Sequence, residues 1–72
     1  MEGSVYKVIE VVGTSTESWE KAASVALMTA ARHLKDIRIG EVMAQDMHIE
    51  DDRTITYRTK LKLSFKYHGD EE

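Results

Sequence analysis

The feature that most constrains this chain is one long alternating segment, RTITYRTKLKLSFKY, at residues 53–67. Its odd positions from Ile55 to Tyr67 are apolar or aromatic except for Thr59, and its even positions are cationic or carry a small hydroxyl group. Such a period of two predicts a β-strand with one apolar face and one polar face. Thirteen extended residues would measure about 43 Å. A chain of 72 residues has little else with which to cover so long an apolar strand.

Three further segments predict the remaining elements. Residues 5–12, VYKVIEVV, are typical of a strand with apolar side chains on both faces. Residues 16–34 carry an alanine-rich apolar stripe at helical spacing, with Ser15 as the expected N-cap and Trp19 as a packing anchor. Residues 38–50 predict a second strand. The chain is therefore expected to form one α+β domain, residues 1–72, with β-α-β-β order and an ordered core of about residues 5–67.

The last two strands are expected to form a hairpin. Apolar positions face apolar positions only if the connecting loop has an odd number of residues. A three-residue loop predicts four pairs of opposite residues: Ile49 with Ile55, Met47 with Tyr57, Met43 with Leu61, and Asp46 with Arg58. The Asp46–Arg58 pair would bring opposite charges together across the strands.

Composition narrows the ways in which so small a domain is stabilised. A core of this size barely offsets the entropy of ordering the chain, so disulfides, a structural metal or self-association are usually needed. The chain has no cysteine, and its three histidines lack the spacing of a metal site. Self-association therefore remains. We expect copies of the same chain to cover the excess apolar surface in a closed assembly of many subunits.

Other classes of function are disfavoured by the sequence. A net charge of −3 argues against nucleic-acid binding. Neither a signal peptide nor a membrane-spanning apolar run is present, so a cytoplasmic protein without a membrane partner is expected. Nucleophile motifs, paired carboxylates and glycine-rich phosphate loops are also lacking in the sequence, which predicts a protein that is not an enzyme.

The segments VYKVIEVVGTS, EVMAQDM and ITYRTKLKLSFKY together resemble the dodecin family, from Val5 to Tyr67. The resemblance implies a three-stranded antiparallel sheet partly wrapped around one helix, and a hollow homododecamer. It also implies a non-enzymatic protein that binds and stores riboflavin, FMN or a related flavin. In flavin-binding dodecins, paired tryptophans sandwich the flavins between subunits and a glutamine on the last strand meets the polar edge of the ring.

The chain departs from this pattern at both positions. Ile39 stands where the stacking tryptophan would fall, and Arg58 stands where the glutamine would fall. The resemblance is thus to a type without the stacking tryptophan, and weaker flavin binding is expected. The cofactor-binding prediction places Ile39 on the walls of an intersubunit pocket and Arg58, Gln45 and Asp46 at its polar edge. The alternative is a shell that binds anions or a divalent metal such as calcium, with residues 50–52 as candidate oxygen ligands.

Overall fold

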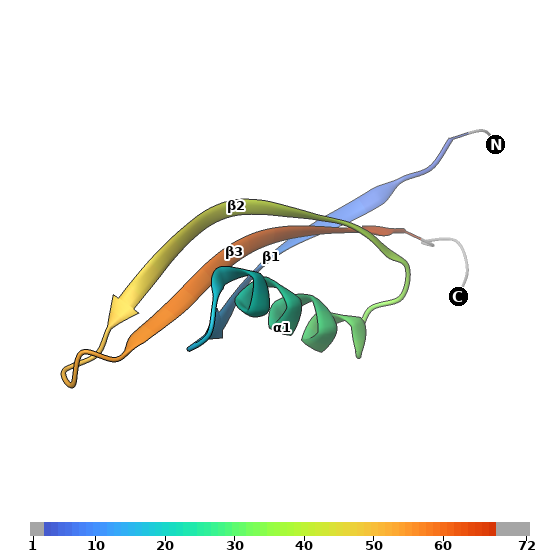
Figure 1. Ribbon diagram of the computed structural model, residues 1–72. Helices are drawn as coiled ribbons and strands as arrows, with labels where there is room; N and C mark the ends of the chain where they lie inside the picture. Colours follow the sequence, from blue (N-terminus) through green and yellow to red (C-terminus); the bar gives the residue numbers. More distant parts are fainter. Residues whose placement is uncertain (1–2, 68–72) are drawn as a thin grey trace.

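A computed structural model describes residues 3–67 (Figure 1). Its four elements are β1 (Tyr6–Ser15), α1 (Trp19–Ala31), β2 (Ile37–Ile49) and β3 (Ile55–Lys66). The strands form one antiparallel sheet in the order β1-β3-β2, and α1 lies against one face of this sheet (Figure 1). The predicted α+β class and β-α-β-β order are confirmed. Residues 1–2 and 68–72, the ends of the expected domain, lie outside the described residues.

The core of the subunit lies between α1 and the central strand β3. Its buried side chains are Ala22 and Ala26 from the helix and Thr59, Leu61 and Leu63 from the strand. Thr59, the exception in the alternation, is fully buried, and its hydroxyl donates a hydrogen bond of 2.9 Å to the carbonyl oxygen of Trp19. A buried hydroxyl is tolerated when it is hydrogen-bonded in this way. The odd positions of β3 therefore face the helix, as the alternation predicts.

The first strand is longer than the sequence predicts because Gly13 does not end it. β1 continues to Ser15, which pairs with Tyr57. A Cβ atom at Gly13 would overlap the carbonyl oxygen of Ala22 and lie 2.9 Å from the Cβ atom of Ala26. Glycine is needed here because the helix backbone approaches the strand too closely for any side chain.

The helix is shorter than predicted, and its N-cap is Ser18 rather than Ser15. The Ser18 hydroxyl oxygen accepts a hydrogen bond of 3.0 Å from the backbone N–H of Lys21. Ser15 instead accepts one of 2.9 Å from the N–H of Glu17 in the turn after β1. Because Ser15 still belongs to the extended strand, the helix cannot begin until the chain has turned away from the sheet.

The predicted hairpin register is correct near the turn and wrong further along. Ile49 faces Ile55 and Asp46 faces Arg58, as predicted. Leu61, however, faces Val42 instead of Met43, because the register shifts between Val42 and Ala44; a second shift lies between Ile37 and Ile39. Each bulge adds one residue to β2, so the side chains that follow it point to the opposite face of the sheet from the one that strict alternation predicts. The apolar residues of β2 are thus divided between both faces, with Val42 and Met47 on the helix side and Ile39 on the opposite side.

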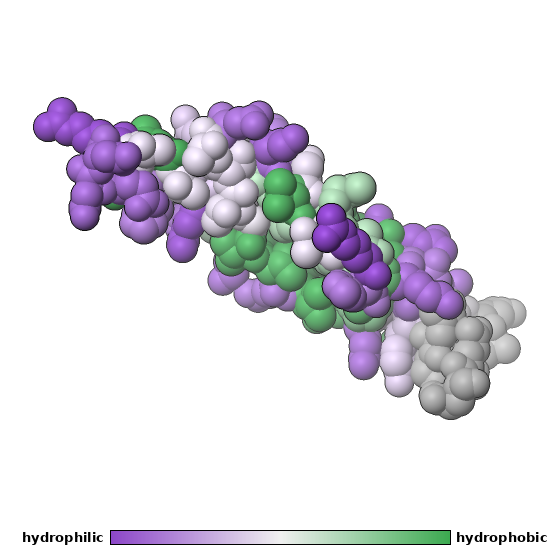
Figure 2. All heavy atoms as spheres, turned by 90° about the horizontal axis from the view of Figure 1, so that it is seen from below, coloured by the Kyte–Doolittle hydropathy of each residue, from purple (hydrophilic) through white to green (hydrophobic). Residues whose placement is uncertain are grey.

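The subunit is elongated, with dimensions of 55 × 20 × 15 Å. Residues 47–57, called the hairpin arm below, extend past the start of α1 to the β2–β3 turn (Figure 1). In the single subunit, all residues of β2 after Ile37 are exposed. Figure 2 shows hydrophobic atoms over the middle of the face that it displays, with hydrophilic atoms around them. One helix covers only part of the sheet, as the length of the strands predicts.

Candidate functional site

The face of the sheet opposite α1, called the helix-free face below, carries three of the four predicted ligand-binding residues. Directly opposed residues of neighbouring strands point to the same side of a sheet. The helix-free face therefore has rows of side chains that run across all three strands. From the hairpin end these rows are Thr14–Arg58–Asp46, Val12–Lys60–Ala44, Glu10–Lys62–Glu41 and Val8–Ser64–Ile39.

Arg58 and Asp46 form a two-pronged ion pair across β3 and β2. The Arg58 Nε donates to Asp46 Oδ1 at 2.7 Å, and Arg58 Nη2 donates to Asp46 Oδ2 at 3.0 Å. The hydrogen bond from Arg58 lowers the pKa of the Asp46 carboxyl below 3.8, and the same bond raises the pKa of Arg58. About half of each side chain is exposed. The pair thus holds the guanidinium in one orientation while one edge of the group stays open to a ligand.

Ile39 lies on the same face but far from this pair. It faces Ser64, and six residues along β3 separate Ser64 from Arg58, which corresponds to about 20 Å. Ile39 is 58% exposed, and Val8, in the same row, is 54% exposed. Within one subunit, Ile39 and Arg58 therefore do not line a common pocket. A pocket that contains both would require residues from other copies.

Gln45 lies on the other side of the sheet. It faces Thr59, whose side chain is buried beneath α1, so Gln45 points toward the helix side. The sheet backbone separates it from Arg58 and Asp46. The structure therefore brings Arg58 together with Asp46, places Ile39 on the same face at a distance, and separates Gln45 from all three.

The acidic turn of the hairpin arm is partly engaged in local hydrogen bonds. The backbone N–H of Thr54 donates to Asp52 Oδ1 at 3.0 Å, which lowers the pKa of the Asp52 carboxyl. Glu50 Oε2 lies 3.4 Å from the Thr56 hydroxyl and 3.5 Å from His48 Nδ1. Within residues 3–67, no group of three or more histidine, aspartate or glutamate side chains is placed to hold a metal ion.

Two features of the structure were not identified from the sequence. The indole N–H of Trp19 donates to the backbone carbonyl of Asp46 at 3.0 Å, and its ring meets Tyr57 edge-on at 5.0 Å. The predicted packing anchor thus also connects the helix start to the strand that carries Asp46. No local pattern could reveal this bond, because it joins residues 27 positions apart.

The second feature is an apolar groove between α1 and the free edge of β1, called the α1–β1 groove below. It has a volume of about 420 Å³. Residues of both elements and of the turn after α1 line it, among them Ile9, Val11, Val25, Ala30, His33 and Leu34. The one sequence signal that could have pointed to this groove is the presence of apolar side chains on both faces of residues 5–12.

The model of the dodecin family matches residues 5–68. The chain is also 51% identical over 63 residues to the calcium dodecin of Mycobacterium tuberculosis, covering 88% of this chain and 89% of that protein. The chain therefore belongs to the dodecin family, whose members are small binding proteins.

Solved structures of dodecins share the fold. A crystal structure of the M. tuberculosis calcium dodecin, described as a calcium-chelating immunodominant antigen with a novel calcium-binding site, has 46% identity and a TM-score of 0.85, over 96% of this chain and 99% of that one. The dodecin of Streptomyces coelicolor has 32% identity and a TM-score of 0.86, over 94% and 97%. A Thermus thermophilus structure has 33% identity and a TM-score of 0.84, over 92% and 97%.

These similarities confirm the resemblance to dodecins and support self-association into a dodecamer. They leave both predicted ligands open, since flavin is possible for the family and the calcium dodecin supports calcium. Across residues 3–67, no helix has the length and apolar character required to cross a membrane.

Proposed function

We propose that this chain forms a homododecamer that binds and sequesters a small ligand between its subunits without catalysing a reaction. Membership in the dodecin family supports this function. The exposure of β2 supports the assembly, because apolar side chains on both of its faces lack a cover in the single subunit. The cytoplasmic location stays a prediction from the sequence.

Calcium is the first candidate for the ligand. The observation that carries this proposal is the 51% identity with a protein named calcium dodecin, over most of both chains. The hydrogen bonding of Arg58 agrees with calcium as the ligand, because the guanidinium already donates two hydrogen bonds to Asp46. A flavin carbonyl would have to compete with that carboxylate or use the remaining N–H groups.

The calcium ligands would be carboxylate oxygens from several copies. Glu50 and Asp51 at the tip of the hairpin arm are exposed, and Asp52 lies beside them in the same turn. The arm carries these groups to the end of the elongated subunit, where they can meet other copies (Figure 1). Calcium prefers six to eight oxygen ligands, more than one such turn supplies.

Flavin is the second candidate, favoured by one specific observation. Val8 and Ile39 form an exposed apolar row with Ser64 on the helix-free face. A flat ring could cover this row, and a second copy could supply the opposite wall. Replacing an aromatic wall by isoleucine would cost roughly 0.5–1.5 kcal/mol per ring face.

The test is a comparison of ligands on assembled protein from which metal has been removed by chelation. Calorimetry with CaCl₂ should show binding, the Tm should rise, and riboflavin fluorescence should stay unquenched in the same protein. A double variant, Glu50→Gln with Asp51→Asn, should weaken calcium binding at least tenfold. The matched variant Glu10→Gln with Glu41→Gln, on the helix-free face, should not.

Two results would change the assignment. Quenching of riboflavin or FMN at micromolar protein, with no response to CaCl₂, would overturn calcium and support flavin. Equal binding of calcium by the wild-type protein and the arm variant would keep calcium as the ligand but remove the hairpin turn from its site.

A further inference from the structure

The α1–β1 groove is an open apolar surface at the edge of the subunit. β1 is an edge strand in the order β1-β3-β2, so one side of its backbone lacks a neighbouring strand within residues 3–67. Val25 on the helix is 41% exposed, and Ala30 and Leu34 continue the apolar lining toward the C-terminal end of α1. A groove of this kind needs an apolar occupant to exclude water.

The hairpin arm carries an apolar surface of matching character. Met47, Ile49 and Ile55 are 49%, 65% and 37% exposed. Ile49 faces Ile55 and Met47 faces Tyr57, so all of these side chains point to the helix side of the sheet. Trp19 covers Tyr57, but α1 begins there and cannot reach the residues further out. The arm therefore presents apolar side chains that its own helix leaves uncovered.

The charges at the ends of these two surfaces are opposite. The tip of the arm, residues 50–53, holds three carboxylates and one arginine. The C-terminal end of α1, where the groove ends at His33 and Leu34, is followed by Lys35 and preceded by Arg32. Asp36 in the same region lies 3.7 Å from Arg38. An acidic tip beside a basic helix end would guide the two surfaces into one orientation.

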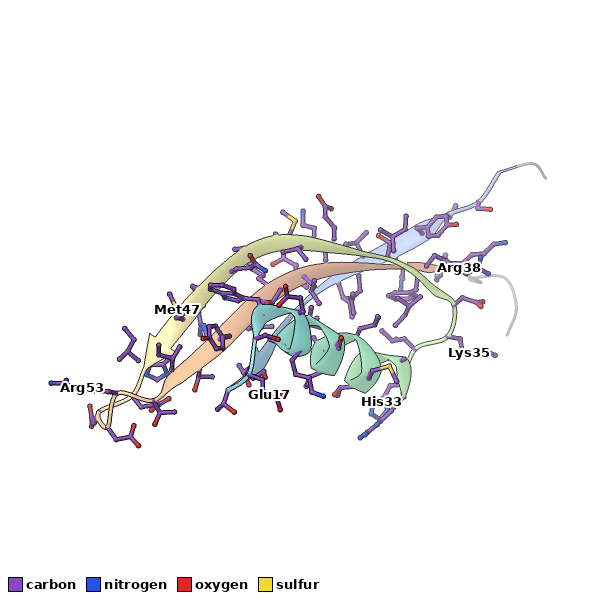
Figure 3. All side chains as sticks on the ribbon, viewed as in Figure 1. Glu17, His33, Lys35, Arg38, Met47 and Arg53 are labelled. Carbon is purple, nitrogen blue, oxygen red and sulfur yellow. The ribbon has the colours of Figure 1, made fainter. Side chains whose placement is uncertain are left out.

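The subunit cannot place its own arm in its own groove. Figure 3 shows Met47 and Arg53 at one end of the molecule and His33, Lys35 and Arg38 at the other. The arm continues β2 and β3 past the start of α1, away from the end of the groove at His33 and Leu34, and cannot fold back onto it. The occupant must therefore come from another molecule.

We propose that the hairpin arm of one subunit docks on the α1–β1 groove of a second copy, with Met47, Ile49 and Ile55 covering the groove and the acidic tip near Arg32 and Lys35. The contact joins two different surfaces, so each subunit offers one arm and one groove. Head-to-tail contacts of this type generate a closed ring when the repeated rotation from one subunit to the next returns to the first subunit. The proposal rests on the proposed self-assembly and is independent of which ligand is bound.

Cysteine cross-linking tests this contact directly, because the chain has no cysteine of its own. Ile49→Cys would be combined in turn with Val25→Cys, Thr29→Cys or Leu34→Cys, and the assembled proteins oxidised. We expect at least one combination to give a ladder of linked subunits on a non-reducing gel. The single variants should remain unlinked, since the docked surfaces are different on the two partners. Light scattering on wild-type and variant proteins establishes assembly beforehand.

The outcomes separate the docking contact from the assembly. Monomeric wild-type protein overturns both. An assembled protein in which every combination stays unlinked overturns the docking contact alone. Dimers from Ile49→Cys by itself would show that two arms meet each other, which also overturns it. If the groove cysteines react fully with a maleimide in the assembled protein, the groove is open or filled by a ligand. That result would also overturn the docking contact.

Discussion

The two strands of the hairpin are similar in length and apolar content, yet they have opposite environments. β3 contributes Thr59, Leu61 and Leu63 to the buried core, whereas every residue of β2 after Ile37 is exposed. The difference arises from position. β3 is the central strand and lies beneath α1, while β2 is an edge strand that α1 barely covers. Apolar side chains on β3 therefore stabilise the subunit, and those on β2 are available for contacts between copies.

The largest expected effect is that of Leu63→Asp. Leu63 is fully buried in the subunit, so a carboxylate there would lose its hydration without a partner. We expect the free energy of unfolding to fall by more than about 4 kcal/mol, which exceeds the reserve of so small a domain. Circular dichroism should show loss of the helix, and light scattering should show loss of the large species. A cooperatively folded variant would contradict the assignment of Leu63 to the core.

The matched change on β2, Ile49→Asp, sharpens the comparison. Ile49 is 65% exposed in the subunit, so its replacement leaves the core intact. The large species should decrease in light scattering while a cooperative unfolding transition is retained. Equal loss of helix in both variants would remove the distinction between the two strands.

The next largest loss of unfolding free energy is expected for a glycine in one outer strand, and a glycine in the other outer strand provides the comparison. Gly13→Ala in β1 places a methyl group against the backbone of Ala22, which must move. We expect a loss of about 3 kcal/mol, at the upper end of overpacking effects. Gly40→Ala in β2 places its Cβ atom 3.4 Å from a Leu63 methyl group, an ordinary contact, so the unfolding free energy should change by less than about 1 kcal/mol. Denaturant unfolding of both variants measures the difference.

A smaller effect is expected for Trp19→Phe. This change keeps an aromatic ring against Tyr57 but removes the indole N–H that donates to the Asp46 carbonyl. The expected loss is about 1 kcal/mol, typical of one neutral hydrogen bond. Tyr57→Phe, which preserves the ring contact, serves as the control. Identical unfolding midpoints for wild type and Trp19→Phe would show that the bond contributes nothing to stability.

The smallest effect is the pH dependence of the Arg58–Asp46 pair. Because Arg58 lowers the pKa of Asp46 below 3.8, the carboxylate stabilises the folded state above that pH. This contribution should disappear as the pH falls through the lowered value and Asp46 is protonated. Asp46→Asn should therefore be less stable than wild type at pH 7 and equal to it at the acid end. A stability difference that is unchanged down to the lowest accessible pH would contradict this account.

Much of the fold could be predicted from the sequence because its period-two and helical patterns are strong. The order of elements follows from these two patterns, and the hairpin turn and the Asp46–Arg58 pair follow from the alternation of the last two strands. The bulges at the start and middle of β2 could not be predicted, since no local signal marks them in IRIGEVMA. They displaced Met43 from Leu61 and separated Ile39 from Met47, which changed the faces on which candidate residues lie.

The candidate site was less accessible to sequence reasoning. The sequence predicts one pocket that contains Ile39, Arg58, Gln45 and Asp46. Within one subunit, however, Gln45 lies on the helix side and Ile39 is remote from Arg58. A site between copies depends on how subunits are arranged, and the pattern of a single chain carries no record of that geometry.

The central position of β3 has a consequence for synthesis of the protein. The ribosome makes β1, α1 and β2 before β3, yet both outer strands pair only with β3. Tyr6 pairs with Lys66, so the sheet closes across nearly the whole described chain. While β3 is still inside the ribosome, β1 and β2 lack the strand with which both of them pair. The helix α1 also lacks the buried residues of β3 on which it packs. Folding of the subunit is therefore expected to wait until β3 has left the ribosome, and subunits folded in this way would assemble only afterwards.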